Sequence, residues 1–375
     1  MKKKVAIITT QAFSLINFRN EVIKKFIAED YEVYALAPDF NKEIINALGD
    51  YGVIAKPIYL SRTLLSPIKL FKEFINLILQ LRKIKPDITL TYFAKALFLG
   101  NIAAIFLRIK SRFSIIEGMG NSGSLIRNNE EVKLYFLSLI YKFSLFKIKK
   151  VFFTNRHDMN FFVSRKIISA NIGINIGGIG VDLQFWQCPE RTPSKYIRFI
   201  LASRMIKSKG IIDYLNAAKK LKKKYTADFL LVGGFDLNSD SLTELDITPY
   251  VDSGVIEWYG NIKNVKDVLC SCDVFVLPSY YGEGVPRSIQ EAMSCAMPVI
   301  TTKSVGCEDT VFEGSNGILI KPKSTQELVS AMETYIKDRN LIYIHGSSSR
   351  KLAIQNFDEH KKSSFLVKMI IENAN

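Results

Sequence analysis

Short apolar runs of strand length alternate with helical patterns along almost the whole chain, and this alternation limits the possible folds more than any other feature. In the first half we expect strands in the runs KVAIITT, EVYALAP, GVIAKPI, DITLTYF, FSIIEG and KVFFT. In the second half we expect them in YIRFILAS, DFLLVGG, VIEWYG, DVFVLPS, MPVITT and GILIKP. Nearly continuous apolar strands that alternate with helices are typical of parallel sheets buried on both faces.

This pattern runs twice in 375 residues, and a chain of that length is too long for one ordinary hydrophobic core. We therefore predict an α/β fold with two doubly wound, Rossmann-like domains. Glycine, proline and polar residues cluster in NIGGIGVDLQFWQCPERTPSKY, as they do in linkers. The predicted domains are residues 1–182 and 183–355, and a final helix over 356–375 is expected to pack back on the first domain.

The net charge of +15 is concentrated in the first half of the chain. Residues 1–180 contain 27 Lys and Arg but only 13 Asp and Glu. Such a field favours an anionic partner, which is a membrane surface, a phosphate-bearing substrate or nucleic acid; the alternative is a solvated basic surface. We expect no nucleic acid, because no recognised module interleaves basic residues with exposed aromatics.

Residues 132–150, VKLYFLSLIYKFSLFKIKK, combine a largely apolar helix with lysines at its edges. This pattern suits a helix at a bilayer interface, or alternatively a buried helix that precedes a strand. No stretch reaches 18 apolar residues, so we expect no membrane span. The chain has five cysteines, of which Cys270 and Cys272 form CxC, and we expect reduced, packed thiols in a cytosolic protein.

In doubly wound sheets, ligands bind beyond the carboxyl ends of the strands. Four strand ends of the second domain carry suitable residues there: Arg204 and Lys209, Gly233, Gly260 and Asn261, and Glu283. The set suits a nucleoside diphosphate, because two cations neutralise phosphates while glycines let the backbone approach closely. Glu291, two turns into the following helix, is placed to accept ribose hydroxyls.

Three segments of the second half carry a resemblance: SRMIKSKGIIDYLNAAKKL, DVFVLPSYYGEGVPRSIQEAMSCAMPVITTKSVGCEDTV and NGILI. They resemble the carboxyl-terminal half of family 4 glycosyltransferases, in particular those of bacterial capsule and O-antigen synthesis. FSLINFRNEVIKKF and IIEGMGNSGS extend the resemblance into the first half. It implies a GT-B fold, with two Rossmann-like domains facing each other across a cleft, and a retaining reaction that needs no metal and no cofactor.

The resemblance also implies a role for each matching residue. Arg204 and Lys209 would stabilise the leaving diphosphate, which agrees with electrostatic stabilisation of charge that grows in the transition state. Glu291 would hold the ribose and Glu283 would contact the donor sugar. The remaining donor-side residues are expected against the sugar and phosphates, at Gly284, Val285, Pro286 and Ser288, or near the base, in the loop with Gly260 and Asn261.

Two positions depart from the family pattern. Many relatives carry a Gly-Gly loop after the first strand, but TQAFSLINFR has no glycine, so Asn17 and Arg19 become candidates for the acceptor side or for phosphate. Many relatives carry a histidine after the fifth strand, where this chain has Glu117. Glu117 is therefore a candidate contact to donor sugar or acceptor, or alternatively only a cap of its loop. For His157 we prefer a helix-start position.

The expected activity is therefore transfer of a sugar, with retention, from a UDP-linked N-acetylated hexosamine or deoxy-hexosamine. The expected acceptor is a glycan on a polyprenyl diphosphate, and the enzyme would lie peripherally on the inner face of the cytoplasmic membrane. The alternatives are a transferase that uses a GDP- or dTDP-sugar and a catalytically inactive protein that binds nucleotide sugars. A UDP-N-acetylhexosamine 2-epimerase is disfavoured, because its usual motifs are absent.

Overall fold

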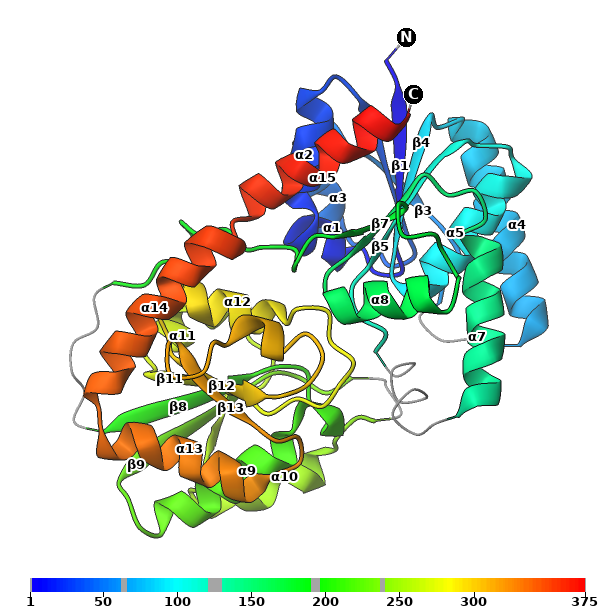
Figure 1. The fold of residues 1–375 in the computed structure, drawn as a ribbon. Helices are drawn as coiled ribbons and strands as arrows, with labels where there is room; N and C mark the ends of the chain where they lie inside the picture. The colour runs from blue at the N-terminus through cyan, green and yellow to red at the C-terminus, as the bar shows by residue number, and fades with distance from the viewer. Residues whose placement is uncertain (1, 62–65, 121–129, 190–195, 237–239, 375) are drawn as a thin grey trace. The chain divides into compact units, whose positions relative to one another are not determined.

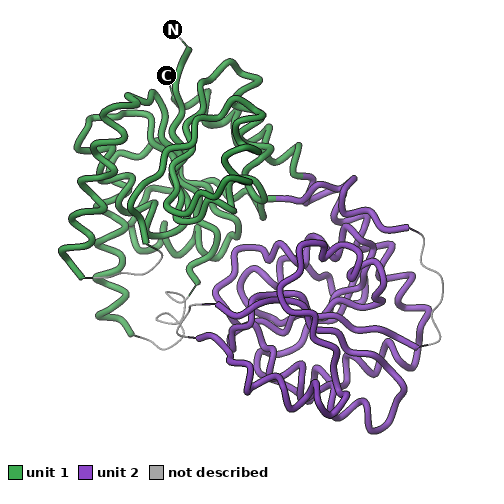
Figure 2. The backbone as a smooth tube through the Cα atoms, turned by 180° about the vertical axis from the view of Figure 1, so that it is seen from behind, with its two compact units in different colours: residues 1–179, 359–375 green, residues 180–358 purple. Residues whose placement is uncertain are grey.

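The computed structural model describes residues 2–61, 66–120, 130–189, 196–236 and 240–374 (Figure 1). The chain forms two compact units, which Figure 2 shows in different colours. Unit 1 comprises Met1–Ile179 together with Glu359–Asn375, and unit 2 comprises Gly180–Asp358. Unit 2 is thus continuous in sequence, whereas unit 1 is completed by the end of the chain.

Unit 1 is built on a seven-stranded parallel sheet in the order β3-β2-β1-β4-β5-β6-β7. The order reverses direction at β1, as in doubly wound folds, where ligands bind at the carboxyl edge near that point. The strands are β1 (Lys4–Ile8), β2 (Glu32–Ala37), β3 (Ile54–Pro57), β4 (Ile88–Tyr92), β5 (Ser111–Ile116), β6 (Lys150–Phe153) and β7 (Gly173–Asn175).

Helices cover both faces of this sheet, because successive strand residues point to opposite faces and both sets are apolar. Val5 and Ile7 belong to a core with α2, α3 and α15, whereas Ala6 and Ile8 belong to a core with α4 and α5 (Figure 1). The helices of unit 1 are α1 (Phe13–Phe18), α2 (Asn20–Ala28), α3 (Lys42–Gly49), α4 (Pro67–Ile84), α5 (Ala94–Phe106), α7 (Glu131–Ser144), α8 (Arg156–Ser164) and α15 (Glu359–Ala374).

Unit 2 repeats the architecture with a six-stranded parallel sheet in the order β10-β9-β8-β11-β12-β13. The strands are β8 (Ile197–Ala202), β9 (Ala227–Val232), β10 (Glu257–Trp258), β11 (Val274–Leu277), β12 (Val299–Thr302) and β13 (Gly317–Ile320). The helices are α9 (Ile211–Lys222), α10 (Glu244–Asp252), α11 (Val265–Cys270), α12 (Arg287–Ser294), α13 (Thr325–Lys337) and α14 (Asn340–Asn356). One face packs on α9 and α13, and the other packs on α11 and α12.

The predicted α/β fold with two parallel-sheet domains is confirmed. Each of the twelve predicted runs contains a strand, and the sequence reasoning missed only the three-residue β7. The run NFRNEVIKKF has the pattern of one helix, but the structure interrupts it at Arg19, which lies between α1 and α2. His157 lies in the first turn of α8, as preferred from the sequence.

Helix α7 confirms the helical pattern within residues 132–150 and shows which side of it is covered. Leu134 and Tyr141 are buried, but the other face exposes large apolar side chains at helical spacing: Val132, Tyr135, Phe136, Leu139, Ile140 and Phe143. Helix α4 also exposes an apolar row, made of Ile68, Phe71, Ile75 and Leu79. Among the described residues, no helix is long and apolar enough to cross a membrane.

The prediction that all cysteines are reduced thiols is wrong for two of them. Cys188 and Cys270 form a disulfide with Cα atoms 5.4 Å apart, although 82 positions separate them in the chain. Cys272, Cys295 and Cys307 are thiols with buried side chains. The pairing arises because the linker segment around Cys188 packs beside the end of α11, and a contact between such distant segments leaves no local signal in the sequence.

Candidate active site

The loops that follow β8 and β11 meet at the carboxyl edge of the sheet in unit 2. The Tyr280 amide donates a hydrogen bond to the Ser208 carbonyl at 2.8 Å, which ties the two loops together. Gly210 makes this approach possible, because its φ is +75° and a Cβ atom there would lie 2.2 Å from the Pro278 carbonyl oxygen. Gly210, directly before α9, therefore fixes the backbone of the loop that carries Lys209.

Lys209 and Glu283 form an ion pair at the centre of this edge. Only 8% of Lys209 and 9% of Glu283 is exposed, so both charges lie largely out of water. Ser279 donates a second hydrogen bond to the same Glu283 oxygen at 3.0 Å. A buried carboxylate with two donors is held in one orientation, because breaking either contact leaves a polar group unsatisfied.

Arg204 lies beside this pair and is about half exposed. It donates to Asp236 at 2.5 Å, and its guanidinium is 6.0 Å from the centroid of the Tyr281 ring. The Lys209 ammonium lies 5.7 Å from the same ring. Burial is the largest single influence and acts to lower the pKa of Arg204, but Asp236, Tyr281 and Glu283 together outweigh it and raise the pKa, so Arg204 stays a cation.

Helix α12 begins directly after the predicted Gly284–Pro286 turn. Gln290 donates from Nε2 to the Val285 carbonyl at 2.9 Å, which fixes the backbone of this turn. The half-buried Ser288 lies in the first turn of the helix. Glu291 accepts a hydrogen bond from Nε of Arg287 at 3.1 Å, one turn away. The helix therefore presents free amides and an oriented carboxylate on the same edge.

Gly306 holds the turn from the opposite side. Its φ is +79°, and a Cβ atom there would lie 1.6 Å from the Gly284 carbonyl oxygen. Burial raises the pKa of the adjacent Cys307 thiol to about 11, and the Glu283 charge adds to this effect. Cys307 is therefore a neutral packing group at neutral pH and supplies no nucleophile.

The ends of β9 and β10 form a third part of this edge. The Gly233 amide donates to the Gly260 carbonyl at 2.8 Å, and Nε1 of Trp258 donates to the Gly233 carbonyl at 3.1 Å. The Phe235 ring is partly exposed and lies 5.3 Å from the Trp258 ring, edge to face. Exposed Asn261 completes the loop. An exposed aromatic face and an amide beside open glycines offer stacking and hydrogen bonds to a planar base.

The carboxyl edge of unit 1 carries a second buried ion pair. Arg19 is 2% exposed and pairs with Glu117, while its guanidinium lies 4.6 Å from the centroid of the Tyr92 ring. The sequence made Arg19 a candidate for the acceptor side or for phosphate, and the structure places its guanidinium inside unit 1. Glu117 is partly exposed, and Asn17 is exposed on α1. The sequence also makes the loop 117–128 a candidate for substrate specificity, and residues 121–128 of it lie outside the described residues.

Sequence reasoning missed several neighbours of the predicted residues. These are Asp236 beside Arg204, Tyr281 between the two cations, Ser279 on Glu283, and Arg287 on Glu291. Only Arg287 had a local signal, because its spacing of four from Glu291 on a helix predicts a pair. The others depend on which loops meet at the sheet edge.

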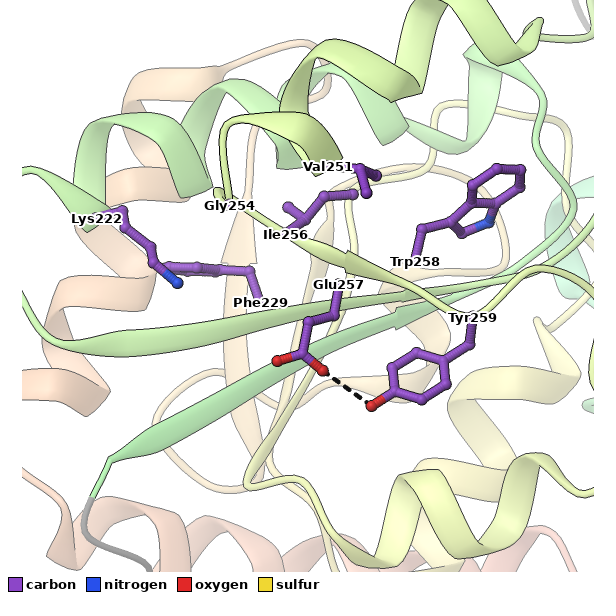
Figure 3. A pocket seen from close by; sticks show the side chains of 8 residues that line it. All are labelled: Lys222, Phe229, Val251, Gly254, Ile256, Glu257, Trp258 and Tyr259. Carbon is purple, nitrogen blue, oxygen red and sulfur yellow. Dashed lines mark hydrogen bonds between the residues drawn. The ribbon is translucent and has the colours of Figure 1, made fainter.

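A pocket of about 590 Å³ lies elsewhere on unit 2, next to the edge strand β10 (Figure 3). Its lining includes Lys222, Phe229 and Trp258, together with Glu257, which accepts a hydrogen bond from the Tyr259 hydroxyl at 2.9 Å. None of the predicted site residues lines it. The strand ends, and not this pocket, therefore define the candidate site.

Residues 197–338, most of unit 2, match the family model described as glycosyl transferases group 1. Unit 2 is a glycosyl transferases group 1 domain. The match confirms the resemblance drawn from the sequence and supports glycosyl transfer as the class of reaction. Arg204, Lys209, Glu283 and Glu291 all lie inside the matched range.

Relatives along the whole chain agree with this family. The chain is 25% identical to the N,N'-diacetylbacillosaminyl-diphospho-undecaprenol alpha-1,3-N-acetylgalactosaminyltransferase of Campylobacter jejuni, with 95% of each chain covered. It is also 25% identical to the Escherichia coli UDP-Gal:alpha-D-GlcNAc-diphosphoundecaprenol alpha-1,3-galactosyltransferase, with 80% of this chain and 78% of the relative covered. Sucrose-phosphate synthase from Thermosynechococcus elongatus has a similar structure, with a TM-score of 0.79, 16% identity and 99% of both chains covered. The GT-B fold is thereby confirmed for the group 1 domain and its companion unit.

Proposed function

We propose that this protein is a retaining glycosyltransferase that moves an N-acetylated hexosamine or deoxy-hexosamine from a UDP-sugar to a polyprenyl-diphosphate-linked glycan. The observation that carries the proposal is the convergence of Lys209, Arg204 and Glu283 beyond the strand ends of the group 1 domain. Two cations around one aromatic ring, beside the start of α12, suit a diphosphate better than any neutral ligand.

The same geometry supplies what sugar transfer needs. As the bond from the anomeric carbon to the diphosphate breaks, negative charge grows on the leaving oxygen, and fixed cations at Lys209 and Arg204 stabilise it. Glu283 would contact hydroxyls of the donor sugar while holding Lys209 in place. The acceptor attacks on the face that the diphosphate leaves, and the leaving phosphate takes the acceptor proton. This scheme retains configuration and assigns no metal and no protein base.

Residues around this centre suit the rest of the donor. Glu291 would hold the ribose, and the backbone of Gly284, Val285 and Pro286 would lie along sugar and phosphates. The Gly260–Asn261 loop, with Phe235 beside it, would contact the base. A UDP donor is supported by the printed name of the Escherichia coli relative, and an N-acetylated donor by that of the Campylobacter jejuni relative.

A lipid-linked acceptor at a membrane is supported by unit 1. This unit contains 30 Lys and Arg against 15 Asp and Glu, whereas unit 2 contains 21 of each. Its helices α4 and α7 expose the two apolar rows described above. Basic surface with exposed aromatic and aliphatic side chains suits an anionic bilayer. We propose peripheral attachment at the inner face of the cytoplasmic membrane, where a polyprenyl diphosphate glycan is accessible.

The first experiment measures thermal shifts with UDP, GDP, dTDP and their sugars, without metal, on wild type and on Glu291→Ala. A ligand that binds only the folded protein raises Tm by an amount that increases with its affinity and concentration. We expect a rise with UDP compounds that Glu291→Ala diminishes. A rise with GDP alone would mean that the donor is a GDP-sugar and not a UDP-sugar. No rise with any nucleotide would contradict the transferase proposal.

The second experiment measures transfer to a synthetic polyprenyl-diphosphate glycan with and without a metal chelator. Turnover by wild type, with α-product from an α-linked donor by NMR, is the expected result. An inverted product would refute retention, and loss of turnover with the chelator would refute metal independence. Nucleotide binding without turnover on any acceptor would favour the alternative, an inactive protein that binds nucleotide sugars.

The membrane part has its own test, in which the protein is sedimented with vesicles of phosphatidylglycerol or of phosphatidylcholine at low salt. We expect binding to the anionic vesicles only, and loss of binding in Phe136→Glu/Phe143→Glu. The matched control is Tyr343→Glu/Ile344→Glu, which places charges at exposed apolar positions of unit 2. Equal binding by both double variants, or no binding by wild type, would refute the membrane surface.

A further inference from the structure

Three cysteine sulfurs from separate segments converge in unit 2, away from the donor residues. Cys188 lies in the predicted linker, Cys270 ends α11, and Cys295 caps the end of α12. Their Sγ atoms all lie within 4.8 Å of one another. Cys188 and Cys270 are joined as a disulfide, and Cys295 is a thiol with a buried side chain. Nothing in the proposed transfer reaction uses this cluster.

We propose that, once the disulfide is reduced, Cys188, Cys270 and Cys295 bind one thiophilic metal cation, with Zn²⁺ as the physiological example. A dithiol reductant supplies two electrons and two protons, which gives two cysteine thiols and leaves the reductant as a disulfide. Metal binding then releases the thiol protons, because thiolates are the ligands. The cluster would therefore have two alternative closed forms, one with a disulfide and one with a metal.

The distances fit such a site. A Zn–S bond of about 2.3 Å in tetrahedral geometry puts sulfur atoms about 3.8 Å apart. The third sulfur already lies within 4.8 Å of the other two, and the Cα atoms of the disulfide pair are 5.4 Å apart. Side-chain rotations at Cys188 and Cys270 are thus sufficient to open the pair around an ion. Three protein ligands leave one position of the tetrahedron for water or an external thiol.

Arg350 on α14 fixes the frame around the cluster. Its guanidinium donates to the Leu183 carbonyl at 3.0 Å and to the Ser294 carbonyl at 2.8 Å. The first contact holds the segment that leads to Cys188, and the second holds the residue next to Cys295. Two of the three ligand segments are therefore positioned by one side chain before any metal binds.

The charges also balance. The Arg350 guanidinium also donates to the Ser294 hydroxyl at 2.6 Å, which places a positive charge beside Cys295. Three thiolates with a divalent cation carry one net negative charge, and the Arg350 guanidinium compensates it. Cys188, Cys270 and Cys295 otherwise pack among apolar residues of the unit 2 core, such as Leu352 and Met293. An apolar shell of this kind strengthens metal–thiolate attraction, and the half-buried Cys188 and Cys270 leave a path for the ion.

The test is a titration of the reduced, desalted full-length protein with Cd²⁺ alone under anaerobic conditions, followed by ultraviolet thiolate-to-cadmium absorption. We expect a band that saturates at one equivalent, because soft thiolate ligands bind Cd²⁺ tightly. Cys295→Ser should abolish the saturable band. Cys272→Ser should retain it, because Cys272 is also a buried thiol but lies outside the cluster. The oxidised protein should give no band.

A second measurement keeps the proposal falsifiable if Cys295→Ser fails to fold. Wild-type protein is reduced, alkylated with and without Zn²⁺ and digested, and the labelled cysteines are identified by mass spectrometry. Zn²⁺ should protect Cys188, Cys270 and Cys295 together. Absence of a saturable band, an unchanged band in folded Cys295→Ser, or protection of a different set of cysteines would each overturn the site. None of these readouts depends on a nucleotide or on transferase activity.

Discussion

The two units share one architecture but differ in how their charge is arranged. All of the net charge belongs to unit 1, whereas positive and negative residues are equal in number in unit 2. Unit 2 concentrates its functional charges in pairs at one sheet edge, of which Lys209–Glu283 is the most buried. Unit 1 also has a buried pair there, Arg19–Glu117, but most of its cations are at the surface. The two units thus differ in arrangement: unit 2 keeps charges in pairs at one sheet edge, whereas unit 1 spreads its excess cations over its surface.

The largest expected effect is a loss of activity when a buried, paired charge of unit 2 is removed, compared with removal of a surface charge of the same unit. Lys209→Met removes the buried cation of the proposed diphosphate site, and we expect kcat to fall by about 10²- to 10³-fold, as for loss of one group that stabilises transition-state charge. Lys207→Met is the matched control, because Lys207 is exposed and lies in the same short turn. Steady-state transfer assays measure kcat for both variants, and Tm is measured in parallel to detect loss of folding. Similar kcat values for the two variants would mean that the buried pair is structural.

The next prediction compares buried and exposed ion pairs within unit 1. Arg19→Met leaves Glu117 unpaired in a largely buried position, which costs about 3–5 kcal/mol of unfolding free energy. Arg165→Met breaks an exposed pair with Glu131 and costs about 0–1 kcal/mol. Urea unfolding measures both values. Arg19→Met/Glu117→Leu should recover part of the loss, and equal costs for Arg19→Met and Arg165→Met would contradict the assignment of Arg19 as an interior residue.

The third prediction concerns the Gly284–Pro286 turn, whose backbone Gly306 approaches closely. Gly306→Ala places a methyl group against the Gly284 carbonyl, so we expect a loss of about 1–3 kcal/mol and weaker UDP binding. Gly314→Ala is the control, because Gly314 has a similar φ of +74° but nothing within 4 Å of its Cβ position. Calorimetric titration with UDP compares the two. If Gly314→Ala weakens UDP as much, the backbone conformation and not the contact is responsible.

The smallest effect is the pH dependence of the contact between Lys362 of α15 and the backbone at Gly177. Lys362 donates to the Gly177 carbonyl at 2.8 Å, and burial lowers its pKa from 10.5 to about 8. Between these pH values the unfolded chain holds a proton that the folded chain has released, so this group makes stability rise with pH. Relative to Lys362→Met, wild type should therefore gain a few degrees of Tm, on the order of 2–4 °C, from about pH 7.5 to pH 10.

The control for this pH effect is Lys361→Met, at an exposed neighbouring position. The Tm of this variant should follow that of wild type across the pH range in scanning calorimetry. A constant difference between wild type and Lys362→Met would mean that Lys362 stays charged in the folded protein.

The sequence predicted what depends on local pattern. Buried parallel strands have apolar runs that end in glycine or polar residues, so twelve strands and the positions of Arg204, Lys209 and Glu283 at strand ends were accessible. Contacts between distant segments were not. Nothing near Arg204 in the sequence indicates Asp236, and nothing indicates that Arg19 turns inward to Glu117 or that Cys188 meets Cys270. β7 was not predicted, because three residues are too few to show the pattern of a strand.

The return of α15 to unit 1 has a consequence for synthesis on the ribosome. Helix α15 covers the apolar side of α2 through Leu366, Val367 and Ile370, and the Ala374 carbonyl accepts a hydrogen bond from Ser111 at 2.6 Å. Unit 2 is one continuous segment and has all its residues before α15 is made. The unit translated first is therefore the one completed last, and the apolar side of α2 has no cover from α15 until residues 359–374 emerge from the ribosome.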